Sequence, residues 1–151
     1  MTFSATKDLA PKINAILSLQ HGSLIRHIDE AKPHLSARTW KAWHALDNLQ
    51  DHRQMRIHLL VRALVEDLDI QPAPADFDQA VGFAHFLTLD SLMPKFKVEL
   101  QETRERLQSL LPTNKSAMDD KIQAAIDLCD KDIQAINVAT NLADQTPSTL
   151  R

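Results

Sequence analysis

The predicted fold follows from one stretch, Gln50-Asp-His-Arg-Gln-Met-Arg-Ile57, in the middle of the segment from Ser36 to Leu68. Apolar residues on both sides of it recur at the spacing of one helix face: Trp43, Leu46, Leu49, Ile57, Leu60 and Leu64. Within the stretch, polar residues fall on or beside this face: Gln50, His52, Arg53 and Arg56. Each polar group on a buried face needs a partner, because an unpaired one costs about 1–3 kcal/mol. The segment therefore predicts a long amphipathic helix with a polar band at mid-height.

Three further segments show helical periodicity, over residues 8–32, from 77 or 85 to 110, and 115–145. Prolines lie in the breaks between the segments. Ser36 is the predicted N-cap of the second helix, and Ser116 with Asp119 a capping box for the fourth. We expect an all-α protein, an antiparallel four-helix bundle forming one domain over residues 1–151. Its core should span about 8–145, before a short disordered tail from Thr146, with these positions buried: Leu24, Leu49, Leu60, Leu92, Ile126 and Ile133.

The connection between the second and third helices has two interpretations. Asp76 with Gln79 can form a capping box that starts the third helix at once. Alternatively, the helix begins near His85 after an irregular segment of about 16 residues. A short linker reaches only about 27 Å, less than the length of the helices, and implies an up-down-up-down bundle. The longer connection allows a crossover along the bundle.

Composition narrows the class of protein. The chain has 151 residues and a net charge of −3, which gives no electrostatic case for nucleic acid or an anionic membrane surface. Two glycines are too few for a glycine-rich phosphate loop. Cys129 is the only cysteine, so no internal disulfide can form, as is typical of the cytoplasm. The first residues lack the apolar core of a signal peptide, and the most apolar run is too short to span a bilayer, so we expect a cytoplasmic protein.

The segments resemble the ferritin-like superfamily, particularly its small bacterial members. The resemblance covers nearly the whole chain and lies in four stretches: Leu19-Gln-His-Gly-Ser-Leu24, Asp29-Glu-Ala-Lys-Pro33, Leu49-Gln-Asp-His-Arg-Gln54 and Phe83-Ala-His-Phe-Leu-Thr-Leu-Asp-Ser-Leu92. It implies the crossover connection. It also implies where a dimetal site would lie, because functional members carry a Glu on two helices and Glu-x-x-His on the other two.

None of the four ligand positions matches that pattern. The chain offers Gln20 or His21 on the first helix, Asp51-x-x-Gln54 on the second, His85 or Asp90 on the third, and Asp127-x-x-Asp130 without a histidine on the fourth. We therefore expect no metal and no cofactor. If a metal site exists, its candidate ligands are His21, Asp51, His52, His85 and Asp90.

The polar band should instead be satisfied by water and by carboxylates such as Asp51 and Asp90, with the fourth helix apolar throughout. Cys129 should be a small buried hydrophobe. Trp40 and Trp43 are more typical of core than of an oligomer contact. The run from Glu99 to Arg106 should be a solvated face with pairs such as Glu102 with Arg106.

Three functions remain. The favoured one is a non-catalytic structural or interaction module that forms a homodimer, since the helical pattern is kept while the metal ligands are lost. The second is a metal-dependent enzyme with an atypical ligand set, either di-iron oxidase-like or zinc hydrolase-like. The third is a binder of a small molecule in the core, with the polar band lining a pocket.

Overall fold

The computed structural model describes residues 2–28, 35–73 and 88–145. Every regular element within them is helical, which confirms the predicted all-α class. The elements are α1 (Thr2–His21), α2 (Ala37–Ala45), α3 (Leu49–Arg62), the π-helical turn η2 (Ala63–Asp67), α4 (Leu89–Ser109) and α5 (Ser116–Gln145). No helix of these residues is long and apolar enough to cross a membrane.

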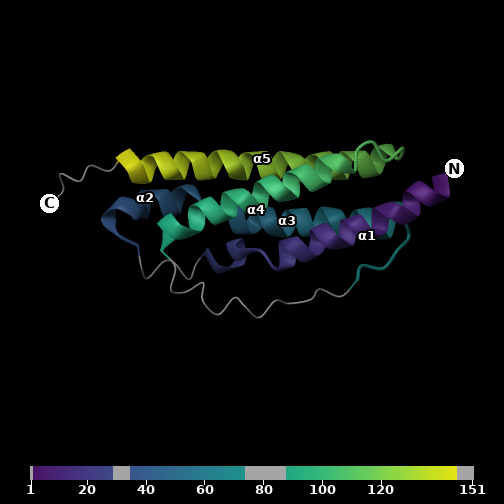
Figure 1. The fold of residues 1–151 in the computed structure, drawn as a ribbon, viewed down its shortest axis with the longest axis horizontal. Helices are drawn as coiled ribbons and strands as arrows, with labels where there is room; N and C mark the ends of the chain where they lie inside the picture. The colour runs from purple at the N-terminus through teal and green to yellow at the C-terminus, as the bar shows by residue number, and fades with distance from the viewer. Residues whose placement is uncertain (1, 29–34, 74–87, 146–151) are drawn as a thin grey trace.

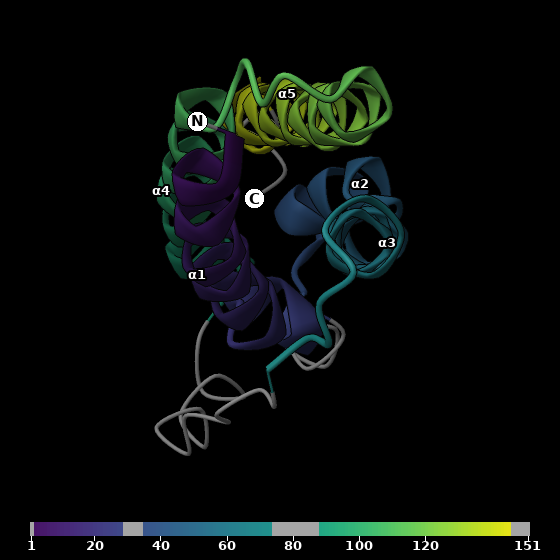
Figure 2. The same ribbon diagram turned by 90° about the vertical axis from the view of Figure 1, so that its right-hand side faces the viewer.

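The four longer helices lie side by side along the long axis of the molecule (Figure 1). α1 and α5 run in one direction, from right to left, while α3 and α4 run in the other. Viewed from the end, α5 lies above, α2 and α3 form one side, and α1 with α4 forms the other (Figure 2). α3 ends at the opposite end of the molecule from where α4 begins. Residues 74–87, which include the two predicted starts of the third helix, lie outside the described residues.

The first helix differs from its prediction. It begins at Thr2 and ends at His21, rather than continuing to about residue 32. The amide of Gly22 donates to the carbonyl of Ser18 and closes the last turn, and residues 24–28 form a 3₁₀ turn. The Leu24 amide donates to the Glu99 carboxylate on α4, at 3.1 Å. The polar gap expected in the middle of a long helix is therefore the end of a shorter one.

The second segment is broken into three pieces instead of one helix. Ser36 is the N-cap as predicted, and it forms a capping box with Thr39. Turn residues 46–48 separate α2 from α3, and η2 continues α3 with a wider turn. Leu49 opens α3 and is fully buried, so the apolar face passes through the break.

The last two helices begin at different kinds of cap. α4 starts at Leu89, four residues after the later of the two predicted starts, and Thr88 caps it through its side chain. α5 spans Ser116–Gln145, in agreement with the predicted 115–145. The expected capping box is wrong in detail, because the Asp119 carboxylate accepts bonds from the amide and hydroxyl of Thr113. The tail beyond Gln145 lies outside the described residues.

The core runs along the space enclosed by α1, α3, α4 and α5. Four of the six residues expected to be inaccessible are buried: Leu49, Leu60, Leu92 and Ile126. Leu24 and Ile133 are only half-buried and pack against the core from its edge. Leu24 is more exposed than predicted because α1 ends before it. Ile133 is more exposed than predicted because the buried face of α5 passes through the preceding residue, Asp132.

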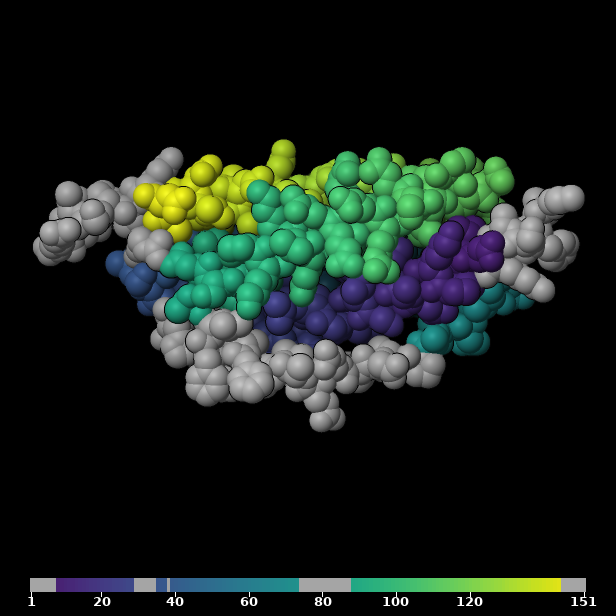
Figure 3. All heavy atoms as spheres, viewed as in Figure 1, coloured from purple at the N-terminus to yellow at the C-terminus, as the bar shows by residue number. Residues whose placement is uncertain are grey.

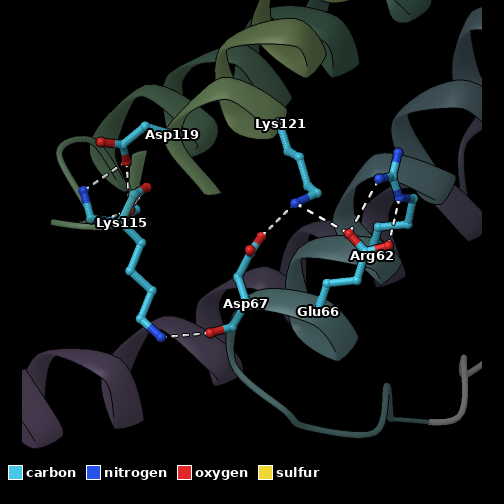
Figure 4. Close-up of polar contacts among 7 residues, drawn as sticks. Arg62, Glu66, Asp67, Lys115, Asp119 and Lys121 are labelled. Atoms are coloured by element: carbon cyan, nitrogen blue, oxygen red, sulfur yellow. Dashed lines mark hydrogen bonds and ion pairs between the residues drawn. The ribbon is translucent and has the colours of Figure 1, made fainter. Parts of the chain in front are cut away.

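Charged side chains join the end of α3 to the start of α5 (Figure 4). The Lys121 ammonium donates to the Asp67 carboxylate at 2.8 Å and lies 3.4 Å from Glu66, which also pairs with Arg62. Lys115 donates to the backbone carbonyl of Asp67 at 2.6 Å. Helix ends leave carbonyls without intrahelical partners, and this bond satisfies one of them. These contacts hold η2 against the start of α5, and they are separate from the polar residues in the interior of the molecule.

Candidate functional site

A cluster of polar side chains lies inside the helical core, and we call it the polar centre: Gln20, His52, Arg53, Arg56, Thr103 and Asp132. Arg56 on α3 is fully buried, with a relative exposure of 0%. Its Nη1 donates to the Asp132 carboxylate at 2.6 Å, and its Nε donates to the Gln20 side-chain oxygen at 2.9 Å. The prediction that Arg53 and Arg56 lie on the buried face of this segment is confirmed.

Asp132 on α5 provides the negative charge of the polar centre. Its exposure is 1%, and its second carboxylate oxygen lies 2.6 Å from Nδ1 of His52. The expectation that the fourth helix is apolar throughout is therefore wrong. The buried face of α5 passes through Cys129, Asp132 and Ile136, in the three- and four-residue steps of a helix seam. That spacing is the signal that sequence reasoning missed.

The expected carboxylate partners, Asp51 and Asp90, are not the acid that pairs with Arg56. Asp51 is exposed on α3. Asp90 lies in the first turn of α4, and the helical rise places it about 20 Å along the axis from Thr103. Asp51 therefore lies on the exposed face of α3, and Asp90 lies far from the polar centre along α4.

Gln20 connects three helices at the end of α1. Its side-chain oxygen accepts from Arg56, while its side-chain nitrogen donates to the Thr103 hydroxyl at 2.9 Å. The Gln20 carbonyl accepts from Arg53, whose Nε also donates to Gln50. The pKa of Arg53 is lowered, first by burial and then by the neighbouring positive charges, including Arg56. Hydrogen bonds thus tie α1, α3 and α4 together through neutral amide and hydroxyl groups.

The candidate metal ligands that the structure describes do not gather at one place. His52 belongs to the polar centre, whereas His21 lines a surface groove beside α3 with Arg53 and Ile57. His85 lies outside the described residues. In residues 2–28, 35–73 and 88–145, no three His, Cys, Asp or Glu side chains form a group that could hold a metal ion. The polar centre instead brings Arg56, Asp132 and His52 together, and the carboxylate compensates the charge of the guanidinium.

Cys129 lies one helical turn from Asp132 and is fully buried. Burial raises the pKa of its thiol to about 11, with the Asp132 carboxylate acting in the same direction and Arg56 opposing it. A thiol with such a pKa is almost wholly protonated at neutral pH, so it has little nucleophilic character. The predicted role of a small buried hydrophobe agrees with this environment.

Glu99 on α4 departs from the predicted solvated face. Its carboxylate accepts from the Ser23 hydroxyl at 2.7 Å and from the Leu24 amide. Burial raises the pKa of Glu99, while these two hydrogen bonds oppose the rise. The predicted pair further along the run is present, with Arg106 donating to Glu102 at 3.1 Å. Only part of the charged run therefore faces solvent.

Two surface features carry exposed apolar side chains. A groove of about 650 Å³ between α3 and α5 is lined mainly by Met55, Leu59 and Leu128, and Met55 is 51% exposed. On α2, Trp40 is 47% exposed and stacks on Trp43, with ring centroids 6.2 Å apart. The interpretation of both tryptophans as core is therefore wrong for Trp40.

Comparison with models of known protein families, with curated proteins and with solved structures gives no match for this chain. The resemblance of its helical segments to the ferritin-like superfamily therefore stays a prediction. What the chain does has to be inferred from the geometry of the polar centre and of the surface.

Proposed function

We propose that this protein is a ferritin-like, antiparallel four-helix bundle that acts as a non-catalytic structural or interaction module. The observation that carries the proposal is the position of Arg56, which is fully buried and paired with Asp132 in the polar centre. A fixed positive charge there opposes the binding of a divalent cation. The carboxylate that a metal would need is already held by the guanidinium.

The course of the helices supports the ferritin-like part of the proposal. α3 and α4 run in the same direction, so α3 ends at the opposite end of the molecule from where α4 begins (Figure 1). This course agrees with the crossover that the resemblance implies. The short-linker alternative would have placed these two helices in opposite directions.

The groove between α3 and α5 supports an interface with a second copy of the chain. Its floor is apolar, and its rim carries both signs of charge, because Asp51 and Asp127 are acidic whereas Lys131 is basic. A two-fold interface brings the same patch of both subunits together. A rim of mixed charge can then pair acid with base across the axis while Met55 and Leu59 become buried.

Sedimentation of the full chain over a concentration series tests the interface. The wild-type protein should be a dimer, and Met55→Glu should shift it to monomer because a carboxylate would be buried in the apolar floor. Val98→Glu is the matched control, since Val98 is 63% exposed on α4, away from the groove. A monomeric wild type, or a dimer insensitive to Met55→Glu, would contradict the proposed homodimer.

Elemental analysis of protein purified without chelators tests the non-catalytic part. Iron and zinc should both be far below one equivalent per chain. Stoichiometric metal that is lost in a His52→Ala variant would favour the metal-dependent enzyme instead.

A further inference from the structure

A groove of about 510 Å³ lies on the surface between the end of α1 and α3, and we call it the Arg53 groove. α1 and α4 lie side by side on the face of the molecule shown in Figure 3, and α3 lies behind them (Figure 2). None of the described residues that line the groove is acidic. They are His21 at the end of α1 and five residues of α3: Arg53, Gln54, Ile57, His58 and Val61.

Arg53 is a nearly buried arginine without an acidic partner. Its exposure is 9%, its Nε donates to the Gln50 side chain at 2.8 Å, and its Nη1 donates to the Gln20 carbonyl at 3.1 Å. Both acceptors are neutral, so neither compensates the charge. The pKa of Arg53 is lowered by burial and then by two neighbouring arginines, and no acid is among the causes. Arg53 differs in this from Arg56, whose charge Asp132 compensates.

The third nitrogen of the Arg53 guanidinium, Nη2, is open to solvent. It has no hydrogen-bond partner among the described residues, and it differs from Nη2 of Arg56, which is both without a partner and shielded from solvent. Nine-tenths of the Arg53 side chain is covered, and the groove that it lines provides the access to Nη2. An acceptor placed in the groove can therefore bind this nitrogen.

The single uncompensated charge favours an occupant with one negative charge. A nearly buried charge without a counter-charge is costly, and an anion at hydrogen-bond distance offsets that cost. A cation would be repelled by the guanidinium. Asp51 and Asp127, which line the neighbouring α3–α5 groove, do not line this one, so no acid among its lining residues opposes an anion. The side chains of Gln54 and His58 can donate further hydrogen bonds to the second oxygen of a carboxylate.

The apolar part of the lining begins one helical turn from Arg53. Ile57 and Val61 follow Arg53 along α3, and the helical rise spreads the three residues over about 12 Å. The volume of the groove lies within the range of about 300–1,000 Å³ that is typical of sites for small organic molecules. Gln54 and His58 also line the α3–α5 groove, so the argument rests on the other three residues of α3, which do not.

We propose that the Arg53 groove binds a small organic carboxylate with an apolar alkyl part. The carboxylate pairs with the guanidinium of Arg53 through Nη2, and the alkyl part lies along Ile57 and Val61. The residues that carry this site differ from those of the α3–α5 groove, so the proposal does not depend on the proposed dimer.

Three probes of nearly equal size and different charge test the proposal: hexanoate, hexanamide and hexylamine. Each is titrated into the ¹⁵N-labelled full chain, and the chemical shifts of the backbone amides are followed. Hexanoate should give saturable shifts at the residues that line the Arg53 groove. The other two probes should bind at least about tenfold more weakly, because only the carboxylate compensates the guanidinium. Acetate should also bind more weakly than hexanoate, since it has too little apolar surface to cover Ile57 and Val61.

Three outcomes of these titrations would overturn the proposal. The first is an absence of saturable shifts with hexanoate. The second is binding of hexanamide, hexylamine or acetate as tight as that of hexanoate. The third is a set of shifts confined to α5 around Ala124 and Leu128, which would place the binding in the α3–α5 groove.

A matched pair of variants ties the binding to Arg53. Ile57→Glu places a carboxylate four residues from Arg53, where it can pair with the guanidinium and repel the ligand. Ile57→Gln is the control, with a side chain of the same size and no charge. The affinity for hexanoate should be at least about fivefold lower in Ile57→Glu than in Ile57→Gln. Equal affinities in the two variants would overturn the proposal.

Arg53→Gln removes the positive charge itself. This variant should lose the preference for hexanoate over hexanamide, and a folded variant that keeps the preference would contradict the assignment. Because Arg53 also donates to Gln20 and Gln50, its folding is checked by circular dichroism. If it does not fold, the two Ile57 variants decide the question, since they leave the bonds of Arg53 in place.

Discussion

The Arg56–Asp132 pair should be strongly coupled in its effect on stability. Replacing Arg56 by Met leaves the Asp132 carboxylate buried at 1% exposure, and replacing Asp132 by Leu leaves the guanidinium buried at 0%. Removing one partner of such a pair costs about 3–5 kcal/mol, because the buried charge that remains has lost its opposite charge in the pair, although Asp132 keeps its contact with His52 and Arg56 its bond to Gln20. Domains of this size are stable by only about 5–15 kcal/mol, so each single variant should lose a large share of its stability.

The double variant distinguishes a charge effect from a packing effect. If the two losses were independent, they would add to about 6–10 kcal/mol and could unfold the protein. We expect the Arg56→Met/Asp132→Leu variant to lose less than either single variant, because neither member of the pair then remains as an uncompensated buried charge.

Urea unfolding of the four proteins measures the coupling directly. The exposed pair of Arg62 and Glu66 is the matched control, and the same substitutions there should show little coupling because solvent screens the pair. Single losses below about 1 kcal/mol at Arg56 and Asp132, or additive losses in the double variant, would show that the two buried charges do not stabilise each other.

Further outcomes are expected elsewhere. The thiol of Cys129, with its pKa raised to about 11, should resist a thiol reagent at pH 8 in the native state and react on unfolding; rapid native labelling would contradict its burial. Leu60→Ala should cost about 2–5 kcal/mol in urea unfolding, whereas Val98→Ala at an exposed position should change stability by less than about 0.5 kcal/mol. Because the pKa of Glu99 is raised, the folded state binds more protons than the unfolded state, and the stability contributed by this group should fall as the pH rises above about 4.5. Urea unfolding of the wild type and of Glu99→Gln over pH 4–7 isolates the contribution of Glu99 to the free energy of unfolding. A contribution that grows as the pH rises would contradict a raised pKa of Glu99.

Local patterns predicted the helices best where the sequence itself supplies the boundary. The bounds of α5 follow from Pro112 and an uninterrupted apolar seam, and Ser36 starts α2 through contacts within its own first turn. The end of α1 could not be predicted in this way. Glu99 satisfies the amide freed after Gly22, and it lies more than seventy residues further along the chain.

The sequence predicted which residues of α3 are buried in the polar centre, but not the residues that pair with them. Helical spacing placed Arg53 and Arg56 on a buried face, and it required that they have partners. The spacing of Cys129, Asp132 and Ile136 indicates that Asp132 lies on the buried face of α5, but which residues of α3 it contacts depends on how the two helices pack. A rotation of about 100° separates consecutive residues on a helix, so Asp132 rather than Ile133 came to occupy the seam.

Diffraction from crystals soaked in Fe(II) and in Zn(II), with anomalous data at each metal edge, would show whether the polar centre binds a metal. We expect the guanidinium of Arg56 to lie within hydrogen-bond distance of Asp132 and Gln20, and no anomalous peak in the polar centre. An anomalous peak there, coordinated by His52 or Asp132 with Arg56 displaced, would contradict that expectation.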